Sequence, residues 1–140
     1  MDRLKVYVDS SVVLRRLLNQ PGAIMSWSDW QLVVSSELMR VEAFRTLDRW
    51  HLEGKLTDGE FADCVSELKT CVAAIEQVPI APAVLKRVAG PLPAPVGTLD
   101  AIHLVSALLW MESSSDELVF VTHDRQQAMA ARACGMEVRS

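Results

Sequence analysis

Short runs of β-branched and aromatic residues alternate along this chain with longer segments of helical periodicity. The first run, Lys5-Val6-Tyr7-Val8, has the composition of a buried strand, and apolar residues recur at helical spacing soon after it. The same pattern places four more strands at residues 31–35, 78–80, 117–121 and 136–138. Because strands that alternate with helices form parallel sheets covered by those helices, the sequence predicts an α/β fold with a mainly parallel sheet and helices on both faces.

Start and stop signals place the helices between these strands. Helices are expected after Ser10, from residue 36 to about 52, from 57 to about 76, at 83–89, from 98 to about 109 and at 126–133. The third of these begins with the capping box Thr57-Asp58-Gly59-Glu60, and Gly135 ends the last. Residues 23–30 form a short helix or a loop, the prolines of 90–97 make that segment an extended loop, and Pro79 suggests an edge position for the third strand.

Length and composition limit the class of protein. The 140 residues indicate one domain, residues 1–140, with 50% hydrophobic residues to form its core. The apolar stretches are too short to span a membrane and the first residues show no signal-peptide pattern, so we expect a cytoplasmic location. The net charge of −4 argues against a broad basic surface for nucleic acid, although it allows an acidic catalytic site flanked by local arginines. Cys64, Cys71 and Cys134 lack zinc-ligand spacing and are expected to be buried small apolar residues.

Four acidic residues fall where the carboxyl ends of the strands are expected. Asp9 ends the first strand, and Glu42 lies one to two turns into the helix after the second. Asp100 lies in the first turn of the helix after the Pro-rich loop, and Asp124 follows the fourth strand. In a doubly wound sheet these positions share the edge where ligands bind. Each acid also has a structural alternative: a helix N-cap for the first and last, a first-turn acid for the third, and an exposed pair of Glu42 with Arg45.

Carboxylates that converge on one place repel one another and raise each other's pKa unless a cation intervenes. A hard divalent cation such as Mg²⁺ or Mn²⁺ complements them because it takes oxygen ligands. Such a cation lowers the pKa of bound water and binds a phosphate oxygen, which is what hydrolysis of a phosphodiester requires. Ser11 and Thr122 add neutral hydroxyls beside the acids.

Four segments, in this order, resemble the PIN-domain ribonucleases, and most closely the small VapC toxins of bacterial toxin–antitoxin pairs. The segments are VYVDSSVVL, SSELMRVEAFR, GTLDAIHLVSAL and FVTHDRQQAMAARACGMEV, and together they extend over essentially the whole chain. The resemblance implies a three-layer α/β fold with a five-stranded parallel sheet and a metal-dependent endoribonuclease. Its acidic cluster, which would bind Mg²⁺ or Mn²⁺, would be Asp9, Glu42, Asp100 and Asp124, and Ser11 and Thr122 match the hydroxyls of the family.

The resemblance also implies partners. The substrate would be RNA, the protein would form a homodimer, and a cognate antitoxin would insert a segment into a groove near the active site. His103 follows Asp100 by one turn on roughly the same helix face, either as a core histidine bonded to backbone or as a ligand or general base. Arg40, Arg45 and Arg125 either contact RNA phosphates or are solvated.

Other functional classes fit these residues less well. A phosphatase of the haloacid dehalogenase type requires Asp-x-Asp after the first strand, whereas Ser11 stands two residues beyond Asp9. A response receiver requires a lysine late in the chain, and none follows Lys86. A metal-dependent adhesion site of the pattern Asp-x-Ser-x-Ser has Val13 at its last position. The alternative that stays open is a PIN-like module that binds RNA or protein without cleaving it.

Overall fold

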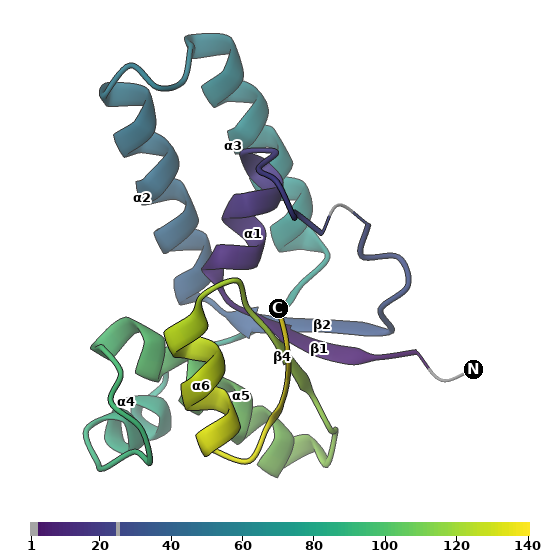
Figure 1. Cartoon of the computed structure of the whole chain (residues 1–140), viewed down its shortest axis with the longest axis vertical. Helices are drawn as coiled ribbons and strands as arrows, with labels where there is room; N and C mark the ends of the chain where they lie inside the picture. Colours follow the sequence, from purple (N-terminus) through teal and green to yellow (C-terminus); the bar gives the residue numbers. More distant parts are fainter. Residues whose placement is uncertain (1–2, 25) are drawn as a thin grey trace.

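The computed structural model describes residues 3–24 and 26–140, and within them the chain forms five strands and six helices (Figure 1). The strands are β1 (Lys5–Val8), β2 (Leu32–Ser36), β3 (Glu76–Val78), β4 (Val119–Val121) and β5 (Glu137–Arg139). The helices are α1 (Ser10–Leu17), α2 (Leu38–Leu52), α3 (Asp58–Ala73), α4 (Pro82–Val88), α5 (Thr98–Ser114) and α6 (Arg125–Ala133). All strand pairs are parallel, in the order β3-β2-β1-β4-β5, which confirms the predicted α/β class.

Successive residues of β1 enter two different cores. Val6 and Val8 pack in the core that α1, α2 and α3 cover, whereas Tyr7 packs in the core that α4, α5 and α6 cover. This division follows from the strand, along which neighbouring side chains point to opposite faces. A strand buried on both faces must be apolar at every position, which explains why β1 and β4 read as continuous apolar runs. The result is a sheet between two helical layers (Figure 1).

The chain reverses its course across the sheet after β3. It first places β1, β2 and β3 from the centre to one edge, and then returns to place β4 on the other side of β1 and β5 beyond it. The carboxyl ends of β1 and β4 therefore flank a topological switch point, where open α/β sheets bind ligands. Asp9 directly follows β1 and Thr122 directly follows β4.

Several boundaries differ from the sequence prediction. Helix α3 ends at Ala73 rather than near residue 76, and β3 ends at Val78 rather than at residue 80. Pro79 has no N–H group to donate to a neighbouring strand, so it lies just beyond β3, which is the edge strand as expected. Residues 23–24 and 26–30 contain no helix, and residue 25 lies outside the described residues. Helix α5 continues to Ser114, beyond its expected end.

The capping box predicted for α3 is present in full. The Thr57 hydroxyl accepts a hydrogen bond from the Glu60 backbone N–H at 3.1 Å, and a Glu60 carboxylate oxygen accepts one from the Thr57 N–H at 2.9 Å. Cys64 and Cys71, also on this helix, are buried free thiols in the core beneath it, as expected, whereas Cys134 is only partly buried. None of the helices in the described parts of the chain is both long and apolar enough to cross a membrane.

Replacement of Thr57 by alanine is expected to lower the free energy of unfolding by about 1 kcal/mol, because the first turn of α3 loses a hydrogen-bond acceptor. Urea denaturation followed by circular dichroism measures this loss. The control is Thr70→Ala at an exposed position in the last turn of the same helix, which should be neutral or slightly stabilising because alanine has the higher helix propensity. Equal midpoints for the two variants would contradict the assigned role of the capping box.

A candidate active site at the carboxyl edge of the sheet

Asp9 connects β1 to α1, and its side chain is only 4% exposed. Its Oδ1 accepts hydrogen bonds from the Ser11 backbone N–H at 3.1 Å and from the Ser11 hydroxyl at 2.5 Å. Its Oδ2 accepts a hydrogen bond from the Thr122 hydroxyl at 2.5 Å. The N-cap alternative for Asp9 is therefore present, and the same carboxylate also lies at the switch point of the sheet, between two hydroxyls from different halves of the chain.

The two hydroxyls join the segment after β1 to the segment after β4. Ser11 Oγ accepts from the His123 backbone N–H at 2.9 Å, and Thr122 Oγ1 accepts from the Asp124 backbone N–H at 3.0 Å. A hydroxyl has one hydrogen to donate, and each of these donates it to Asp9. The 3.3 Å approach between the two hydroxyl oxygens is thus a consequence of their common partner, because neither has a hydrogen left for the other.

Burial raises the pKa of Asp9, while the hydroxyls of Ser11 and Thr122 and the neighbouring His103 act in the opposite direction. Removing a carboxylate from water disfavours its charged form, whereas hydrogen-bond donors favour it. The hydroxyls therefore offset part of the cost of burial, and burial still has the larger effect on the pKa of Asp9. Positive charge placed near this carboxylate would favour its ionised form further.

Asp124 and Asp100 are held together by Gln127. Oδ1 of Asp124, the N-cap of α6, accepts from the backbone N–H groups of Gln126 at 2.9 Å and Gln127 at 3.1 Å. The Gln127 side-chain amide also donates to the Asp100 backbone carbonyl at 3.0 Å. Gln127 is fully buried and thus fixes the first turn of α6 against the first turn of α5. Gln127 was not predicted as a site residue. The sequence feature that indicates it is a polar side chain on the helix face that carries Ala128 and Ala131.

Asp100 is half-buried, and its pKa is raised. Burial is the largest cause, followed by the negative charges of Asp124, Asp9 and Glu42, with His103 opposing them. One carboxylate shifts the pKa of another only when the two are near, so the other three acids predicted for this edge lie within electrostatic reach of Asp100. The charges of these three acids all raise the pKa of Asp100, so negative charge is concentrated at this edge of the sheet.

Glu42 does not form the exposed pair with Arg45 that its spacing allowed. Arg45 instead pairs with Asp48 at 2.9 Å, and Glu42 Oε1 accepts a hydrogen bond from His103 Nε2 at 2.6 Å. The other ring nitrogen of His103, Nδ1, lies 2.8 Å from the Tyr7 hydroxyl. His103 is 1% exposed and so belongs to the core, but the expectation that it would bond to backbone is wrong, because both of its partners are side chains.

Within the residues that the structure describes, no three side chains of His, Cys, Asp or Glu stand close enough together to share one metal ion. Mg²⁺ is ordinarily bound through one or two carboxylates, with water and substrate phosphate in its remaining positions. The acids and hydroxyls at this edge offer the oxygen ligands that Mg²⁺ and Mn²⁺ prefer. The residues therefore fit a divalent cation held by one or two carboxylates, and they do not form a closed cage of protein ligands.

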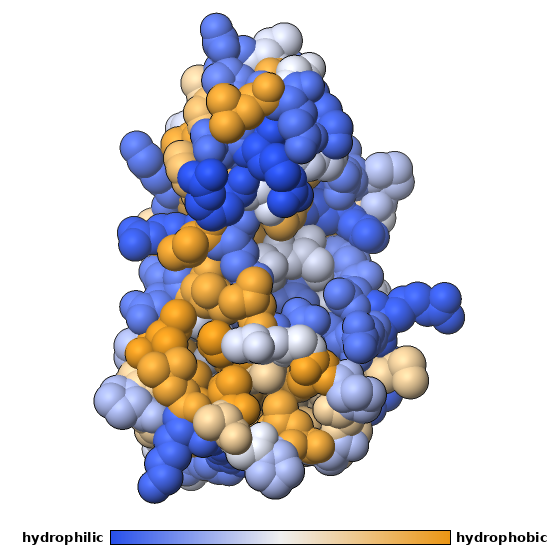
Figure 2. All heavy atoms as spheres, turned by 90° about the vertical axis from the view of Figure 1, so that its left-hand side faces the viewer, coloured by the Kyte–Doolittle hydropathy of each residue, from blue (hydrophilic) through white to orange (hydrophobic). Residues whose placement is uncertain are grey.

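An apolar groove of about 520 Å³ lies between α2 and α3. Its lining is Arg40, Val41, Phe44, Val65, Leu68, Lys69, Val72 and Ala73. Val41 is 51% exposed and precedes Glu42, and Leu99 is 50% exposed and precedes Asp100, so exposed apolar residues adjoin two of the acids in sequence. Figure 2 shows apolar side chains gathered on the side of the molecule that carries α2 and α4.

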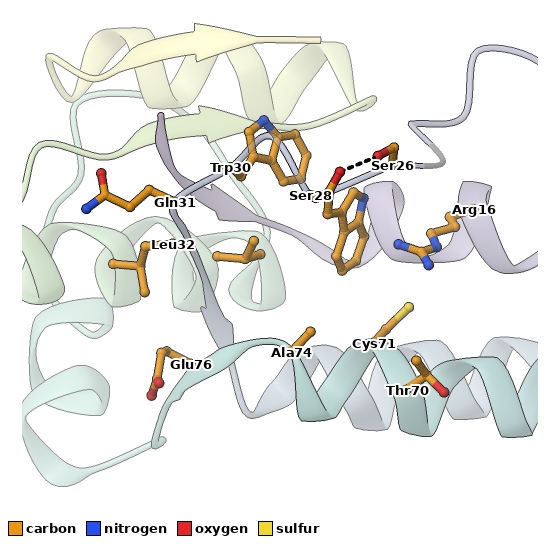
Figure 3. A pocket seen from close by; sticks show the side chains of 12 residues that line it. Arg16, Ser26, Ser28, Trp30, Gln31, Leu32, Thr70, Cys71, Ala74 and Glu76 are labelled. Atoms are coloured by element: carbon orange, nitrogen blue, oxygen red, sulfur yellow. Dashed lines mark hydrogen bonds between the residues drawn. The ribbon is translucent and has the colours of Figure 1, made fainter. Parts of the chain in front are cut away.

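A second pocket of about 550 Å³ lies at the opposite end of the sheet, where β2 and β3 begin (Figure 3). Trp27 and Trp30 stack there with ring centroids 5.9 Å apart, and the Arg16 guanidinium lies 4.6 Å from the centroid of Trp27. Glu76 is the only acid among the described residues that line this pocket. This pocket has one carboxylate and, among its described residues, none of the hydroxyl–carboxylate contacts found at the other edge. The pocket is therefore the weaker candidate for an active site.

Comparison with known proteins identifies no family: no protein-family model matches the chain, and no curated protein matches it. What the chain does must therefore be inferred from its own acids, hydroxyls and grooves. The acids and hydroxyls gather at the carboxyl edge, between α1, α5 and α6.

Replacement of Thr122 by valine is expected to lower the free energy of unfolding by about 1–3 kcal/mol, because Asp9 Oδ2 and the Asp124 N–H both lose their buried partner while the side-chain shape is kept. Urea denaturation at neutral pH measures the change. Thr70→Val on the exposed face of α3 is the matched control and should change stability much less. A loss of the same size in both variants would show that the hydroxyl of Thr122 contributes nothing specific.

Replacement of Asp100 by asparagine is expected to stabilise the fold at neutral pH, because it removes a charge that burial and three other acids disfavour. The folded pKa of Asp100 is raised, so the folded state binds more protons than the unfolded state between the two pKa values, and stability falls as pH rises through that window. The gain from Asp100→Asn should therefore be largest above the folded pKa and shrink in acid. Urea midpoints at neutral and acidic pH test this, with the exposed Asp63→Asn as control; a gain independent of pH would contradict it.

Proposed function

We propose that this protein is a Mg²⁺- or Mn²⁺-dependent endoribonuclease that hydrolyses RNA phosphodiesters and acts as the toxin of a toxin–antitoxin pair. The observation that carries the proposal is the buried Asp9 carboxylate between two hydroxyls at the switch point of the sheet, with Asp100 near enough to Asp124, Asp9 and Glu42 for their charges to raise its pKa after burial. Acids that repel one another at the switch point of a parallel sheet form a site whose repulsion a divalent cation would relieve. The ordered resemblance to PIN-domain ribonucleases of the VapC type supports the same function.

In the proposed reaction a water molecule attacks phosphorus, loses a proton as it does so, and the leaving oxygen gains one. One or two of the carboxylates of Asp9, Asp100 and Glu42, the last through Oε2, would bind the cation directly, and water would link it to the others. A bound divalent cation supplies the positive charge that polarises the attacking water and the phosphate. The proton that the water loses would pass to a carboxylate of the edge that does not bind the cation directly. Ser11 and Thr122 keep Asp9 in place throughout.

The RNA would lie across the carboxyl edge, with exposed arginines near it as contacts for phosphate. Arg125 is exposed in the first turn of α6, directly after Asp124, and Arg40 is exposed in the first turn of α2, two residues before Glu42. Contacts of this kind fix the position of the backbone without reading sequence. Arg45 already pairs with Asp48, which makes it a poorer candidate.

The antitoxin would occupy the groove between α2 and α3. The groove is apolar with Arg40 and Lys69 in its lining, so the complementary segment would present apolar side chains with acidic ones beside them. A segment seated there would also cover Val41, next to Glu42, and so would obstruct the acid edge. A homodimer would bury further exposed apolar residues, such as Leu85 and Met129, and the location of an enzyme that acts on cellular RNA would be the cytoplasm.

The alternative function is a PIN-like module that binds RNA or protein without cleaving it. Such a module would not need acids whose charges oppose one another, because binding alone gains nothing from that repulsion. The two functions differ in what the acids do: in the nuclease they hold a cation, and in the module they do not.

Calorimetric titration of Mn²⁺ is expected to show binding to the wild-type protein and binding at least about tenfold weaker to Asp9→Asn and Asp100→Asn, since each removes an oxygen ligand. Cleavage of a mixture of cellular RNAs should require the cation and be lost in Asp100→Asn. Asp63→Asn, on the exposed side of α3, removes the same charge away from the site and should behave as the wild type.

The outcomes separate the two functions. Equal Mn²⁺ binding by all four proteins would remove the acids from the metal site. Wild-type protein that binds RNA but neither takes up Mn²⁺, alone or with RNA present, nor cleaves would support the non-cleaving module instead.

A further inference from the structure

His103 is a buried histidine with side-chain partners on both ring nitrogens. Tyr7 hydroxyl lies 2.8 Å from Nδ1, and Glu42 Oε1 lies 2.6 Å from Nε2. The three residues come from β1, α5 and α2, so the contact runs from the centre of the sheet through one helix to another. Tyr7 is completely buried, and Glu42 is the partly exposed end of this chain of contacts, near enough to Asp100 for its charge to raise the pKa of that residue.

The hydrogen bond between His103 and Glu42 has one direction. An ionised carboxylate only accepts hydrogen bonds, so the hydrogen between His103 and Glu42 is on Nε2. Burial raises the pKa of Tyr7 well above its ordinary value, so the phenol retains its hydrogen. Nδ1 accepts that hydrogen when the imidazole is neutral and donates to the phenol oxygen when the imidazole is charged. In both forms His103 donates to Glu42 through Nε2, and Tyr7 holds the ring through Nδ1.

We propose that Tyr7 and His103 are positioning residues that hold Glu42 through its Oε1 atom and thereby present its Oε2 atom to the acid edge. The inference rests on the proposed nuclease function. It adds that two buried residues, Tyr7 and His103, orient a carboxylate that binds the cation. Groups that hydrogen-bond a metal-binding carboxylate fix its orientation, and their loss commonly weakens metal binding or activity by about one to two orders of magnitude.

The hydroxyl of Tyr7 can be removed without disturbing its ring. The ring stacks on Phe120, with centroids 5.1 Å apart and planes at 18°, and meets His103 edge-on at 5.9 Å. Tyr7→Phe keeps these contacts and removes only the donor to Nδ1. A role limited to packing therefore predicts no functional change in this variant, whereas the positioning role predicts one.

The first readout is nitrogen-15 NMR of His103 at neutral pH. The wild-type protein should show a protonated Nε2, and Tyr7→Phe should show a smaller share of the Nε2-protonated form. The second readout is Mn²⁺ affinity, expected to fall about tenfold in Tyr7→Phe. In RNA cleavage the loss should appear in kcat with KM little changed, because the phosphate contacts are untouched.

A pair of variants at position 103 tests the donor itself. His103→Gln places a side-chain amide N–H near the position of Nε2 and should retain much of the Mn²⁺ affinity. His103→Leu has no hydrogen-bond donor there and should lose that affinity. His51→Gln is the matched control, because His51 also bonds a carboxylate through Nε2, that of Asp58 at 2.7 Å, on the connection between α2 and α3. It should leave both readouts unchanged.

Failure of this inference is distinguishable from failure of the proposed function. Wild-type protein that binds Mn²⁺ and cleaves RNA, together with Tyr7→Phe that does both equally well, overturns the positioning role and leaves the nuclease intact. An unprotonated Nε2 in the wild type overturns it as well, whatever the activity, because His103 would then have no hydrogen to donate to Glu42. If the wild type neither binds Mn²⁺ nor cleaves, the nuclease proposal fails, and the positioning of Glu42 for a cation fails with it.

Discussion

The buried carboxylate of Asp9 is the interaction on which the rest of the site depends. It lies where β1 ends, and its two oxygens take hydroxyl donors from Ser11 on its own side and from Thr122 on the far side of the switch point. Each hydroxyl in turn accepts a backbone N–H of the segment after β4. The most deeply buried of the four acids is thus also the link that joins the two halves of the sheet, and its removal would loosen both.

The acids at this edge act against the stability of the fold. Asp100 and Asp9 both have raised pKa values, with burial as the main cause, and the other carboxylates add to the effect at Asp100. A protein selected for stability alone would not gather such charges at one place, and sites where local energetics are unfavourable tend to be functional. A bound cation would supply the positive charge that these gathered carboxylates lack, and would thus account for their arrangement.

The fold could be predicted from the sequence because strands buried on both faces appear as continuous apolar runs, as β1 and β4 do. Part of the site could be predicted as well, because Asp9 directly follows β1 and Asp124 closely follows β4. The partner of Glu42 did not follow. On a helix surface Glu42 and Arg45 are as well placed to meet as Arg45 and Asp48, and only the distant His103, brought in by α5, decides the matter. Gln127 was missed for the same reason: its role depends on Asp100, which lies far from it in sequence.

The two N-cap acids differ in how much of each carboxylate the fold uses. Asp9 has both oxygens engaged by donors and is buried, so its position is fixed. Among the hydrogen bonds of the described residues, Asp124 accepts only through Oδ1, from two backbone N–H groups, and its side chain is exposed. Capping therefore orients Asp124 while leaving Oδ2 open to water. Asp9 is the acid that organises the edge, and Asp124 is the one most exposed to solvent.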